Sequence, residues 1–377
     1  MISQLSLLGD PVTITPPTEG IKYAGSKLKI IPYILQLATK VGAQTVLDAF
    51  SGTTRVTQAF AKTGFQVTAN DSAVWSKVFA QCYLLNKKEP TYYQKMINHL
   101  NSLPGKDGWY TEHYGGEVNG ANSEQKDGLK KPWQIHNTRK LDAIREEIDV
   151  IASDETEKSV LLTSLILALD KVDSTIGHFA SYVKNWSPRS YNEMKLFVPA
   201  LFQSSKEHAV YQSDIFDLLP SQEADLAYFD PPYGSNNDKM PPSRIRYQAY
   251  YHVWKTICLN DKPALFGRVK RRVDTSDEIA SSVFEDFHKD SNGKFVVVNA
   301  IGRLLRECKC QYLILSYSSQ GRATTEQLME LLNESGKLIS CLNIAYRRNV
   351  MATMRWTNEW VKQENTVNKE YLFLIKK

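Results

Sequence analysis

The feature that most constrains the fold is a strand–turn–helix–strand unit over residues 45–71. It begins with the apolar run "TVLDAF", continues through the turn "SGTT" and the helically spaced "RVTQAFAKTG", and ends with a second strand, "FQVTAND". Gly64 closes the predicted helix, and Asp71 ends the second strand. Short apolar strands that alternate with helices are typical of a parallel sheet covered on both faces. We therefore predict an α/β fold with a doubly wound sheet.

The sheet pattern breaks after this unit and resumes much later. Residues 89–205 contain two predicted helices, "NTRKLDAIREEIDVIAS" and "EKSVLLTSLILALDKV". Strand-like runs return with "AVYQSD" and "ADLAYF", and the chain finishes with "CQYLILSYSS", "LISCLNIAYR" and "EYLFLIKK". We expect residues 1–88 and 206–377 to form one catalytic sheet domain, with 89–205 as a mainly helical insertion. A second, basic insertion is expected at about 235–300.

Composition is that of an ordinary globular protein. Of the 377 residues, 42% are hydrophobic and 23% charged, and the net charge of +5 is a mild basic excess. No apolar run is long enough to span a bilayer, and the N-terminus lacks the basic start of a signal peptide. Five cysteines without a CxxC pair indicate neither a disulfide framework nor a zinc site, so we expect no metal and a reducing, cytoplasmic setting.

The stretch "AYFDPPYGSNND" at 227–238 ends a predicted strand abruptly. Pro231 and Pro232 cannot continue a central strand, and the first of them pushes Asp230 into an extended conformation. The second proline fixes a turn that presents Tyr233 close behind. We interpret these four residues as a rigid mount for one carboxylate and one aromatic ring.

Two further polar stretches predict a ligand site. In an open α/β sheet, ligands bind beyond the carboxyl ends of the strands, and Gly52 lets the backbone of the first turn approach such a ligand. One glycine is not the GxGxxG fingerprint, so a nucleoside-type ligand without a pyrophosphate fits better than a dinucleotide. Asp71 can bind ribose hydroxyls or cap the next helix. Upstream, Lys27 in "IKYAGSK" can hold a carboxylate near a helix N-terminus, or the stretch can be a flexible arm.

Three motifs together point to one enzyme family: "KYAGSK" at 22–27, "DAFSG" at 48–52 and "DPPY" at 230–233. They resemble the α group of N6-adenine DNA methyltransferases, the Dam-like enzymes that use S-adenosylmethionine. The order of the motifs matches this group, with its long insertion between the glycine turn and DPPY. The closing "KEYLFLIKK" is similar to the family's last strand. The chain departs from the family at Thr54, where a second glycine is common.

The resemblance implies a fold, a reaction and a cofactor. The fold is a Rossmann-like S-adenosylmethionine methyltransferase sheet with an inserted target-recognition region. The reaction is site-specific methylation of N6 of an adenine flipped out of double-stranded DNA, with a restriction endonuclease for the same site as an expected companion. Asp230 and the Pro231 carbonyl would accept the hydrogens of the target amine and free its lone pair. Tyr233 would stack on the base, and Pro232 belongs to the same catalytic turn.

The resemblance also implies cofactor contacts by position. Tyr23 and Lys27 would hold the amino-acid end of S-adenosylmethionine, and Asp71 its ribose. Asp214 would accept from the amine of the cofactor's adenine, with a helix cap as the alternative. The other residues implied to border the cofactor are Phe50, Gly52, Ile215 and Asp230.

A basic segment follows the DPPY motif. Residues 239–272 hold nine Lys or Arg and one acidic residue, Asp261, with aromatics interleaved. Such a segment suits phosphate contacts and base stacking, although the aromatics can equally pack the insertion and the charges form a solvated face. In the first insertion, Arg189 is predicted to contact a base edge, with a phosphate contact or a helix cap as alternatives. The other predicted DNA-contacting residues are Arg244, Arg246, Arg268, Lys270, Arg271 and Arg272.

Three other functions stay open at this point. RNA adenine would undergo the same flipped-base chemistry, whereas methyltransferases for protein amides usually carry Asn where this chain has Asp230. A catalytically silent nucleic-acid-binding subunit would be expected to lose DPPY or the glycine turn, and both are present. The sequence therefore predicts a DNA adenine methyltransferase.

Overall fold

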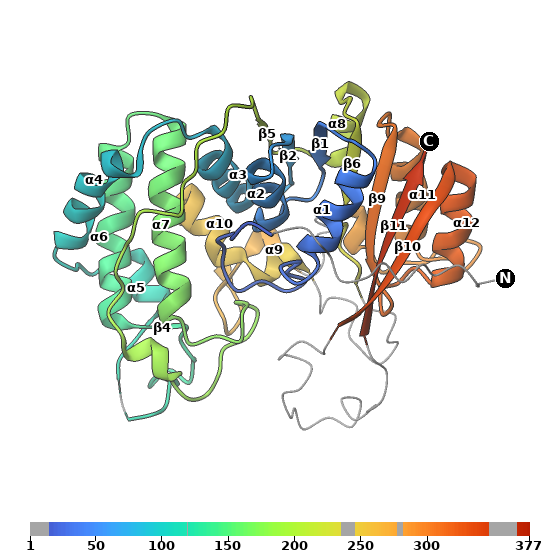
Figure 1. Cartoon of the computed structure of the whole chain (residues 1–377). Helices are drawn as coiled ribbons and strands as arrows, with labels where there is room; N and C mark the ends of the chain where they lie inside the picture. The colour runs from blue at the N-terminus through green and yellow to red at the C-terminus, as the bar shows by residue number, and fades with distance from the viewer. Residues whose placement is uncertain (1–14, 119, 235–245, 277–281, 347–367) are drawn as a thin grey trace.

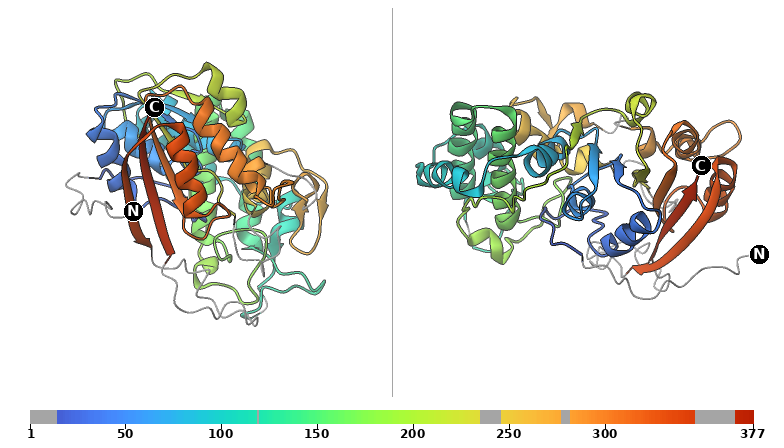
Figure 2. Two further views of the ribbon diagram at one scale, coloured as in Figure 1. Left: turned by 90° about the vertical axis from the view of Figure 1, so that its right-hand side faces the viewer. Right: turned by 45° about the horizontal axis from the view of Figure 1, so that its top comes forward.

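A computed structural model describes residues 15–118, 120–234, 246–276, 282–346 and 368–377. A seven-stranded sheet forms one half of it, and a body of helices stands beside the sheet (Figures 1 and 2). The strand order is β10-β11-β9-β6-β1-β2-β5. The bounds of these strands are β1 (Thr45–Asp48), β2 (Gln66–Asn70), β5 (Ala209–Tyr211), β6 (Leu226–Phe229), β9 (Tyr312–Ser318), β10 (Lys337–Tyr346) and β11 (Asn368–Lys376).

The sheet is mainly parallel, as the sequence predicts. Strand β1 lies between β2 and β6 and is parallel to both, and β5 and β9 extend this parallel set on either side. Strand β11 lies between β9 and β10 and is antiparallel to both. The strand order reverses between β1 and β6, and such a switch point is where open α/β sheets bind their ligands.

Helices cover both faces of the sheet. Alternate residues of a strand point to opposite faces, and in β1 Val46 packs with α1 and α2 while Leu47 packs with α11 and α12. Every residue of β6 is buried. Burial on both faces is the property that defines a doubly wound sheet. The covering helices are α1 (Ile31–Lys40), α2 (Arg55–Lys62), α11 (Val296–Glu307) and α12 (Thr325–Ser335).

The helical body follows β2 in sequence and ends before β5. Its two longest helices, α6 and α7, lie in the segments that the sequence pattern predicts, and α4 buries Tyr93, Ile97 and Leu100 at helical spacing. Helix α3 continues into a π-helical turn, η1. The bounds are α3 (Val74–Ala80), η1 (Gln81–Leu85), α4 (Pro90–Ser102), α5 (Trp109–Tyr114), β3 (Gly115–Gly116), β4 (Trp133–Gln134), α6 (Ile135–Ile151), α7 (Glu155–Val172) and η2 (Pro188–Tyr191).

Part of the segment after DPPY joins this helical body. Tyr251, Trp254 and Ile257 are buried in the same apolar cluster as α4, α6 and α7. These two aromatics therefore pack a core, which is one of the alternatives that the sequence leaves open. The remaining short elements are α8 (Ile215–Leu218), η3 (Leu219–Ser221), α9 (Tyr247–Tyr250), α10 (His252–Leu259), β7 (Leu265–Phe266), β8 (Arg271–Arg272), η5 (Val273–Thr275) and η6 (Val283–Glu285). Within the described ranges, no helix has both the length and the apolar character to cross a membrane.

Candidate active site

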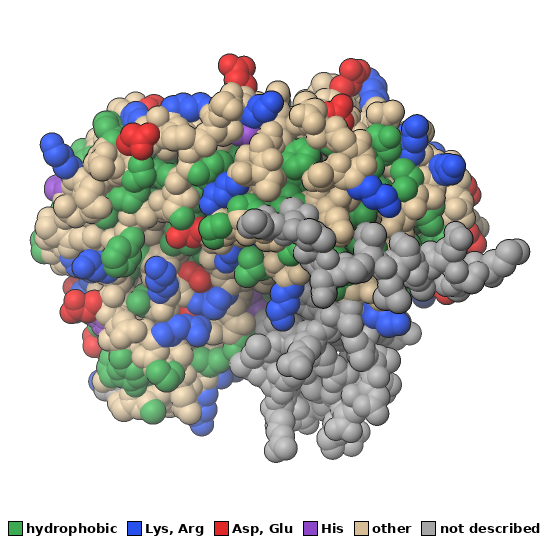
Figure 3. Space-filling model, in the orientation of Figure 1, with side chains coloured by type: hydrophobic (Ala, Val, Ile, Leu, Met, Phe, Trp, Pro, Cys, Tyr) green, Lys and Arg blue, Asp and Glu red, His purple; other side chains and the backbone are tan. Residues whose placement is uncertain are grey.

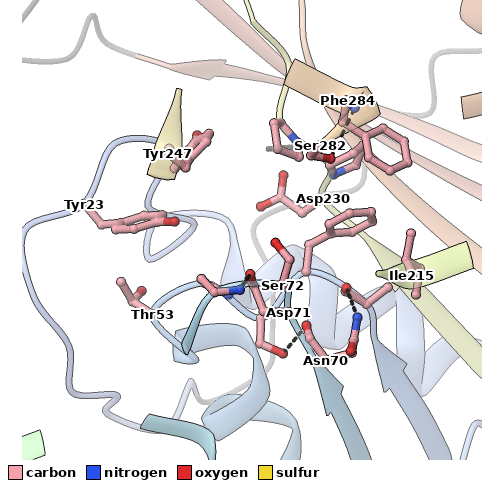
Figure 4. A pocket seen from close by; sticks show the side chains of 18 of the residues that line it. Tyr23, Thr53, Asn70, Asp71, Ser72, Ile215, Asp230, Tyr247, Ser282 and Phe284 are labelled. Atoms are coloured by element: carbon pink, nitrogen blue, oxygen red, sulfur yellow. Dashed lines mark hydrogen bonds between the residues drawn. The ribbon is translucent and has the colours of Figure 1, made fainter. Parts of the chain in front are cut away.

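A pocket opens at the carboxyl ends of β1, β2 and β6, at the switch point of the sheet (Figure 4). It brings together the N-terminal arm, the turns after these strands and the start of α8 and α9. Every predicted catalytic and cofactor residue lines it. These residues are Tyr23, Lys27, Phe50, Gly52, Asp71, Asp214, Ile215, Asp230, Pro231, Pro232 and Tyr233. Among the described residues, no group of three or more His, Cys, Asp or Glu is placed to hold a metal ion.

Asp71 ties the turn after β1 to the end of β2. Its Oδ2 accepts from the Gly52 amide at 2.8 Å, and its Oδ1 accepts from the Ala73 amide at 2.9 Å. Burial raises the pKa of Asp71, and these amide hydrogen bonds oppose that rise. The carboxylate thus fixes the entry to α3, as in the capping alternative, while it stays on the pocket wall.

The turn after β1 has a glycine-like backbone at two positions. Gly52 has φ of +52° and Thr54 has φ of +61°, so both lie in the left-handed region. Thr54 is the position where the family commonly has glycine, and a non-glycine residue in this region costs roughly 1–2 kcal/mol. The Thr54 hydroxyl accepts from the Gln58 side chain at 3.1 Å, which fixes the threonine in this conformation. Thr54 therefore adopts a left-handed conformation that glycine adopts without this cost.

Asp214 begins α8 as its N-terminal cap. Its Oδ1 accepts from the Phe216 amide at 2.9 Å, which is the helix-capping alternative. The adjacent Ile215 is buried and gives the pocket an apolar wall (Figure 4).

The DPPY motif places Asp230 directly off the end of β6, and its carboxylate faces Tyr23 and Tyr247 across the pocket (Figure 4). Its Oδ1 accepts from the Tyr233 hydroxyl at 2.6 Å and lies 2.9 Å from the Lys27 Nζ. No described residue makes a hydrogen bond to its Oδ2. One oxygen is thus fixed and the other is available on the pocket side.

Lys27 has a different setting from the one that the sequence predicts. Its Nζ lies between the carboxylates of Asp230 and Glu370, at 3.3 Å from the Glu370 Oε1, and it contacts the Tyr233 hydroxyl. Burial lowers the pKa of Lys27, but the two carboxylates outweigh it and raise the pKa overall. Because two carboxylates already balance this ammonium, the geometry does not favour a role for Lys27 toward the cofactor's own carboxylate.

Glu370 is the residue that sequence reasoning missed. It lies on β11, is 7% exposed, and its Oε1 accepts from the Tyr233 hydroxyl and from the Ser316 hydroxyl, each at 2.7 Å. A signal was present, because Glu370, Leu372 and Leu374 alternate along β11 and all are buried. An acidic residue on the buried face of a strand needs partners, and these partners are in the active site.

The Tyr233 ring is less open than predicted. Lys27 Nζ lies 4.5 Å from its centroid, and the Tyr317 ring lies 5.0 Å away. A second aromatic surface faces the pocket instead. The Tyr23 ring stacks on the rings of Tyr247 and Tyr251, with ring centroids 5.4 and 4.4 Å apart.

Charge and burial set the titration of Asp230. Burial raises its pKa, Lys27 lowers it and Glu370 raises it, with a result of about 6. The carboxyl is therefore mostly ionised at neutral pH, as an acceptor of amine hydrogens must be.

A comparison with known protein families assigns the chain. The model of the D12 class N6 adenine-specific DNA methyltransferases matches residues 23–331. The chain belongs to this family. This confirms the resemblance drawn from the three motifs. Relatives of the chain are named as modification methylases or type II methyltransferases.

The chain is 28% identical over 352 residues to the modification methylase StsI of Streptococcus sanguinis, covering 87% of this chain and 48% of that protein. It is 28% identical over 367 residues to the type II methyltransferase M.NlaIII of Neisseria lactamica, covering 95% and 99%. It is 25% identical over 371 residues to the type II methyltransferase M.FokI of Planomicrobium okeanokoites, covering 95% and 53%. The chain thus spans about half the length of StsI and of M.FokI, and nearly the whole length of M.NlaIII.

The basic residues of this D12 methyltransferase are partly committed to the fold. Arg272 is buried, and its five N–H groups donate to Asp261, Asp274 and the Thr256 hydroxyl at 2.6–3.3 Å. Because every N–H of its guanidinium already has an acceptor, Arg272 could contact a phosphate only by breaking this network, and the geometry does not favour the predicted DNA contact. Arg246 is also buried and donates to the Ser276 carbonyl at 3.1 Å.

The other predicted DNA contacts differ in exposure. Arg271 lies over the Phe266 ring at 5.1 Å and donates to the Thr275 carbonyl, while Arg268 is exposed and Lys270 is half-buried. On the face in Figure 3, Lys and Arg are scattered among acidic and apolar side chains. Arg244 lies outside the described residues.

Arg189 lies in η2, and its guanidinium is paired within the helical body. Its Nη2 and Nε lie 2.6 and 2.9 Å from the Asp173 Oδ1, and Nη2 also donates to the Thr175 carbonyl at 2.8 Å. The same Asp173 oxygen lies 3.0 Å from the Lys22 Nζ. The contacts favour a structural role over the predicted base contact.

Proposed function

We propose that this chain transfers a methyl group from S-adenosylmethionine to N6 of a flipped-out adenine in double-stranded DNA. It would act as the modification enzyme of a restriction–modification pair. The observation that carries the proposal is the placement of Asp230, with Oδ1 fixed by Lys27 and Tyr233 and Oδ2 available on the wall of the switch-point pocket. The family supports the type of reaction, and the roles of the individual residues are part of the proposal.

The pocket suits a nucleoside-type methyl donor. The strand order reverses at the floor of the pocket. The left-handed residues Gly52 and Thr54 shape the turn after β1 so that its backbone can approach a ligand, and Asp71 lines the pocket at the end of β2. Ile215 offers an apolar wall beside the Asp214 carboxylate. When bound, S-adenosylmethionine supplies an electrophilic methyl group on a sulfonium sulfur. The residues that would hold it are Tyr23, Phe50, Gly52, Asp71, Asp214 and Ile215.

Asp230 addresses the central difficulty of the reaction. The lone pair of an adenine amine is delocalised into the ring, so the amine is a poor nucleophile. The Asp230 Oδ2 and the Pro231 carbonyl would accept its two hydrogens and favour tetrahedral geometry at nitrogen. The carboxylate is fixed before the substrate arrives, because Lys27 and Tyr233 hold it from its other oxygen.

The target base must leave the duplex to reach this pocket. We propose that the rings of Tyr23 and Tyr247, in addition to Tyr233, provide surfaces beside which an adenine can stack. The helical body over residues 89–205 is proposed as the target-recognition region, since the sheet needs none of it to form the pocket floor.

A methyl-transfer assay with a labelled donor tests the proposal. The substrates are a duplex plasmid, the same sequence as single-stranded DNA, and an RNA copy, and the products are hydrolysed to nucleosides. We expect label in N6-methyladenine from the duplex. Label in RNA alone, or in another base, would overturn the proposal.

A further inference from the structure

Glu370 shares its partners with the proposed catalytic carboxylate. Lys27 lies 2.9 Å from Asp230 and 3.3 Å from Glu370, and the Tyr233 hydroxyl lies 2.6 Å from the first carboxylate and 2.7 Å from the second. These contacts converge on one oxygen of each carboxylate, the Asp230 Oδ1 and the Glu370 Oε1. The two carboxylates are therefore coupled through one amine and one hydroxyl.

The hydroxyl cannot satisfy both carboxylates. Tyr233 carries a single O–H proton, so it donates to Asp230 or to Glu370 at any moment. The ammonium of Lys27 has three N–H donors and can serve both carboxylates at once, but its single positive charge is shared between their two negative charges. Ser316 binds the Glu370 Oε1 at 2.7 Å and anchors this carboxylate to β9, so Glu370 stays in place as a competitor. Glu370 therefore competes with Asp230 for the Tyr233 proton and offsets part of the Lys27 charge that would otherwise act on Asp230 alone.

We propose that Glu370 is a positioning residue. It shares the Lys27 ammonium and the Tyr233 hydroxyl with Asp230, and so keeps Asp230 a strong hydrogen-bond acceptor toward the pocket. Without this competitor, the ammonium and the hydroxyl would bind Asp230 alone and neutralise much of its negative potential. The inference rests on the proposed function, because it assumes that Asp230 accepts the hydrogens of the target amine.

The charged and titratable groups around Asp230 come from six different parts of the fold. Removal of Glu370 takes away a negative neighbour, and removal of Lys27 takes away the nearest positive one. The two changes should therefore move the Asp230 pKa from about 6 in opposite directions. The groups that face Asp230 are Lys27 of the N-terminal arm, Asp48 of β1, Tyr228 of β6, Tyr233 of the DPPY turn, Tyr247 of α9 and Glu370 of β11.

The test is the pH dependence of kcat/KM for methylation of a duplex substrate, since this ratio reports the free enzyme. Wild-type activity should fall on the acid side near pH 6, as Asp230 becomes protonated. Glu370→Gln should lower kcat roughly 10–100-fold, because Asp230 becomes a weaker acceptor, and should lower the pH at which activity falls on the acid side by about 1 unit. Lys27→Met should raise the pH at which kcat/KM falls on the acid side, which we call the acid limb. Glu370→Asp keeps the charge and should keep the limb near its wild-type position.

The helical body supplies a matched control. Glu157 is also buried and bonds a lysine, a tyrosine and a serine: Lys88 at 2.6 Å, Tyr92 at 3.0 Å and Ser153 at 2.9 Å. Glu157→Gln should lower stability without moving the limb. Activity loss in Glu370→Gln with an unmoved limb, or failure of both Glu370 variants to fold, would make Glu370 a structural residue and overturn the inference. No methyl transfer by the wild type would instead reject the proposed function.

Discussion

Two clusters of buried charge in this methyltransferase each place a basic residue between two carboxylates, but they differ in whether every hydrogen-bonding atom has a partner. Beside the pocket, Lys27 lies between the carboxylates of Asp230 and Glu370. At the β7–β8 hairpin, Arg272 lies between two carboxylates that are only partly buried, those of Asp261 and Asp274. Each N–H of Arg272 has an acceptor, whereas Asp230 keeps one oxygen to which no described residue donates.

The contrast separates charges that stabilise the fold from charges that can act on a ligand. A ligand of Arg272 would have to compete with an existing bidentate pair, and such pairs are the strong hydrogen bonds of proteins. A ligand of Asp230 meets an acceptor that is already oriented by Lys27 and Tyr233 and that still has capacity. Saturation of the partners, more than burial, distinguishes the two clusters.

The largest expected effect is at the open carboxylate. Asp230→Ala removes an acceptor that is proposed to be preorganised, so kcat should fall by at least about 10²–10³-fold. Binding of S-adenosylmethionine, measured by calorimetry, should remain, because Gly52 and Asp71 are untouched. Asp261→Ala in the saturated cluster is the matched control and should leave kcat unchanged. Near-normal turnover in Asp230→Ala would remove the distinction between the clusters.

The saturated cluster should respond in stability instead. Arg272→Ala leaves Asp261 and Asp274 without their partner, and loss of one member of a fully buried pair costs about 3–5 kcal/mol. Both aspartates are more than a third exposed, so water can solvate them and we expect a loss of about 2 kcal/mol in a urea titration. The salt dependence of DNA affinity should not change. A shallower salt slope in this variant would show that Arg272 leaves its aspartates to contact a phosphate.

The contrast also shows what the sequence can and cannot predict. Gly52, Asp71 and Asp230 each follow a strand of the predicted parallel sheet, and the carboxyl ends of such strands meet at one edge. Local signals therefore sufficed to bring these residues into one pocket. Composition gave the basic character of the segment after DPPY but not its partners, since Arg272 finds Asp261 through the β7–β8 hairpin.

Glu370 shows the opposite limit. It is 137 residues from Tyr233 in the chain, and the contact depends on β11 entering the sheet between β9 and β10. A motif search around DPPY cannot reach a residue whose role is set by strand order. The alternation of Glu370 with buried leucines was a usable local sign, but it indicates burial and not the partner.

A smaller effect is expected where basic residues keep free capacity. Arg268 is exposed and Lys270 is half-buried in the turn between β7 and β8. If each contacts one phosphate, alanine at each position should make the slope of log affinity against log salt shallower by up to ~0.9. Lys40 is an exposed control at the end of α1, just before β1 begins and thus at the opposite edge of the sheet from the pocket. An equal change in Lys40→Ala would mean that only net charge matters.

The smallest effect should come from Arg189, which belongs with the saturated charges. Its guanidinium holds Asp173 and the Thr175 carbonyl, and Asp173 in turn pairs with Lys22 of the N-terminal arm. Arg189→Ala should lower stability by about 1 kcal/mol or less, because this side chain is 37% exposed. The methylated motif should be unchanged. Sequencing of methylated positions after treatment with the variant decides the matter, because a true bidentate base contact discriminates by about 1–3 kcal/mol and its loss would relax one base pair. A relaxed motif would show that Arg189 leaves Asp173 when DNA binds, and that pairing in the free protein does not by itself exclude a role on the substrate.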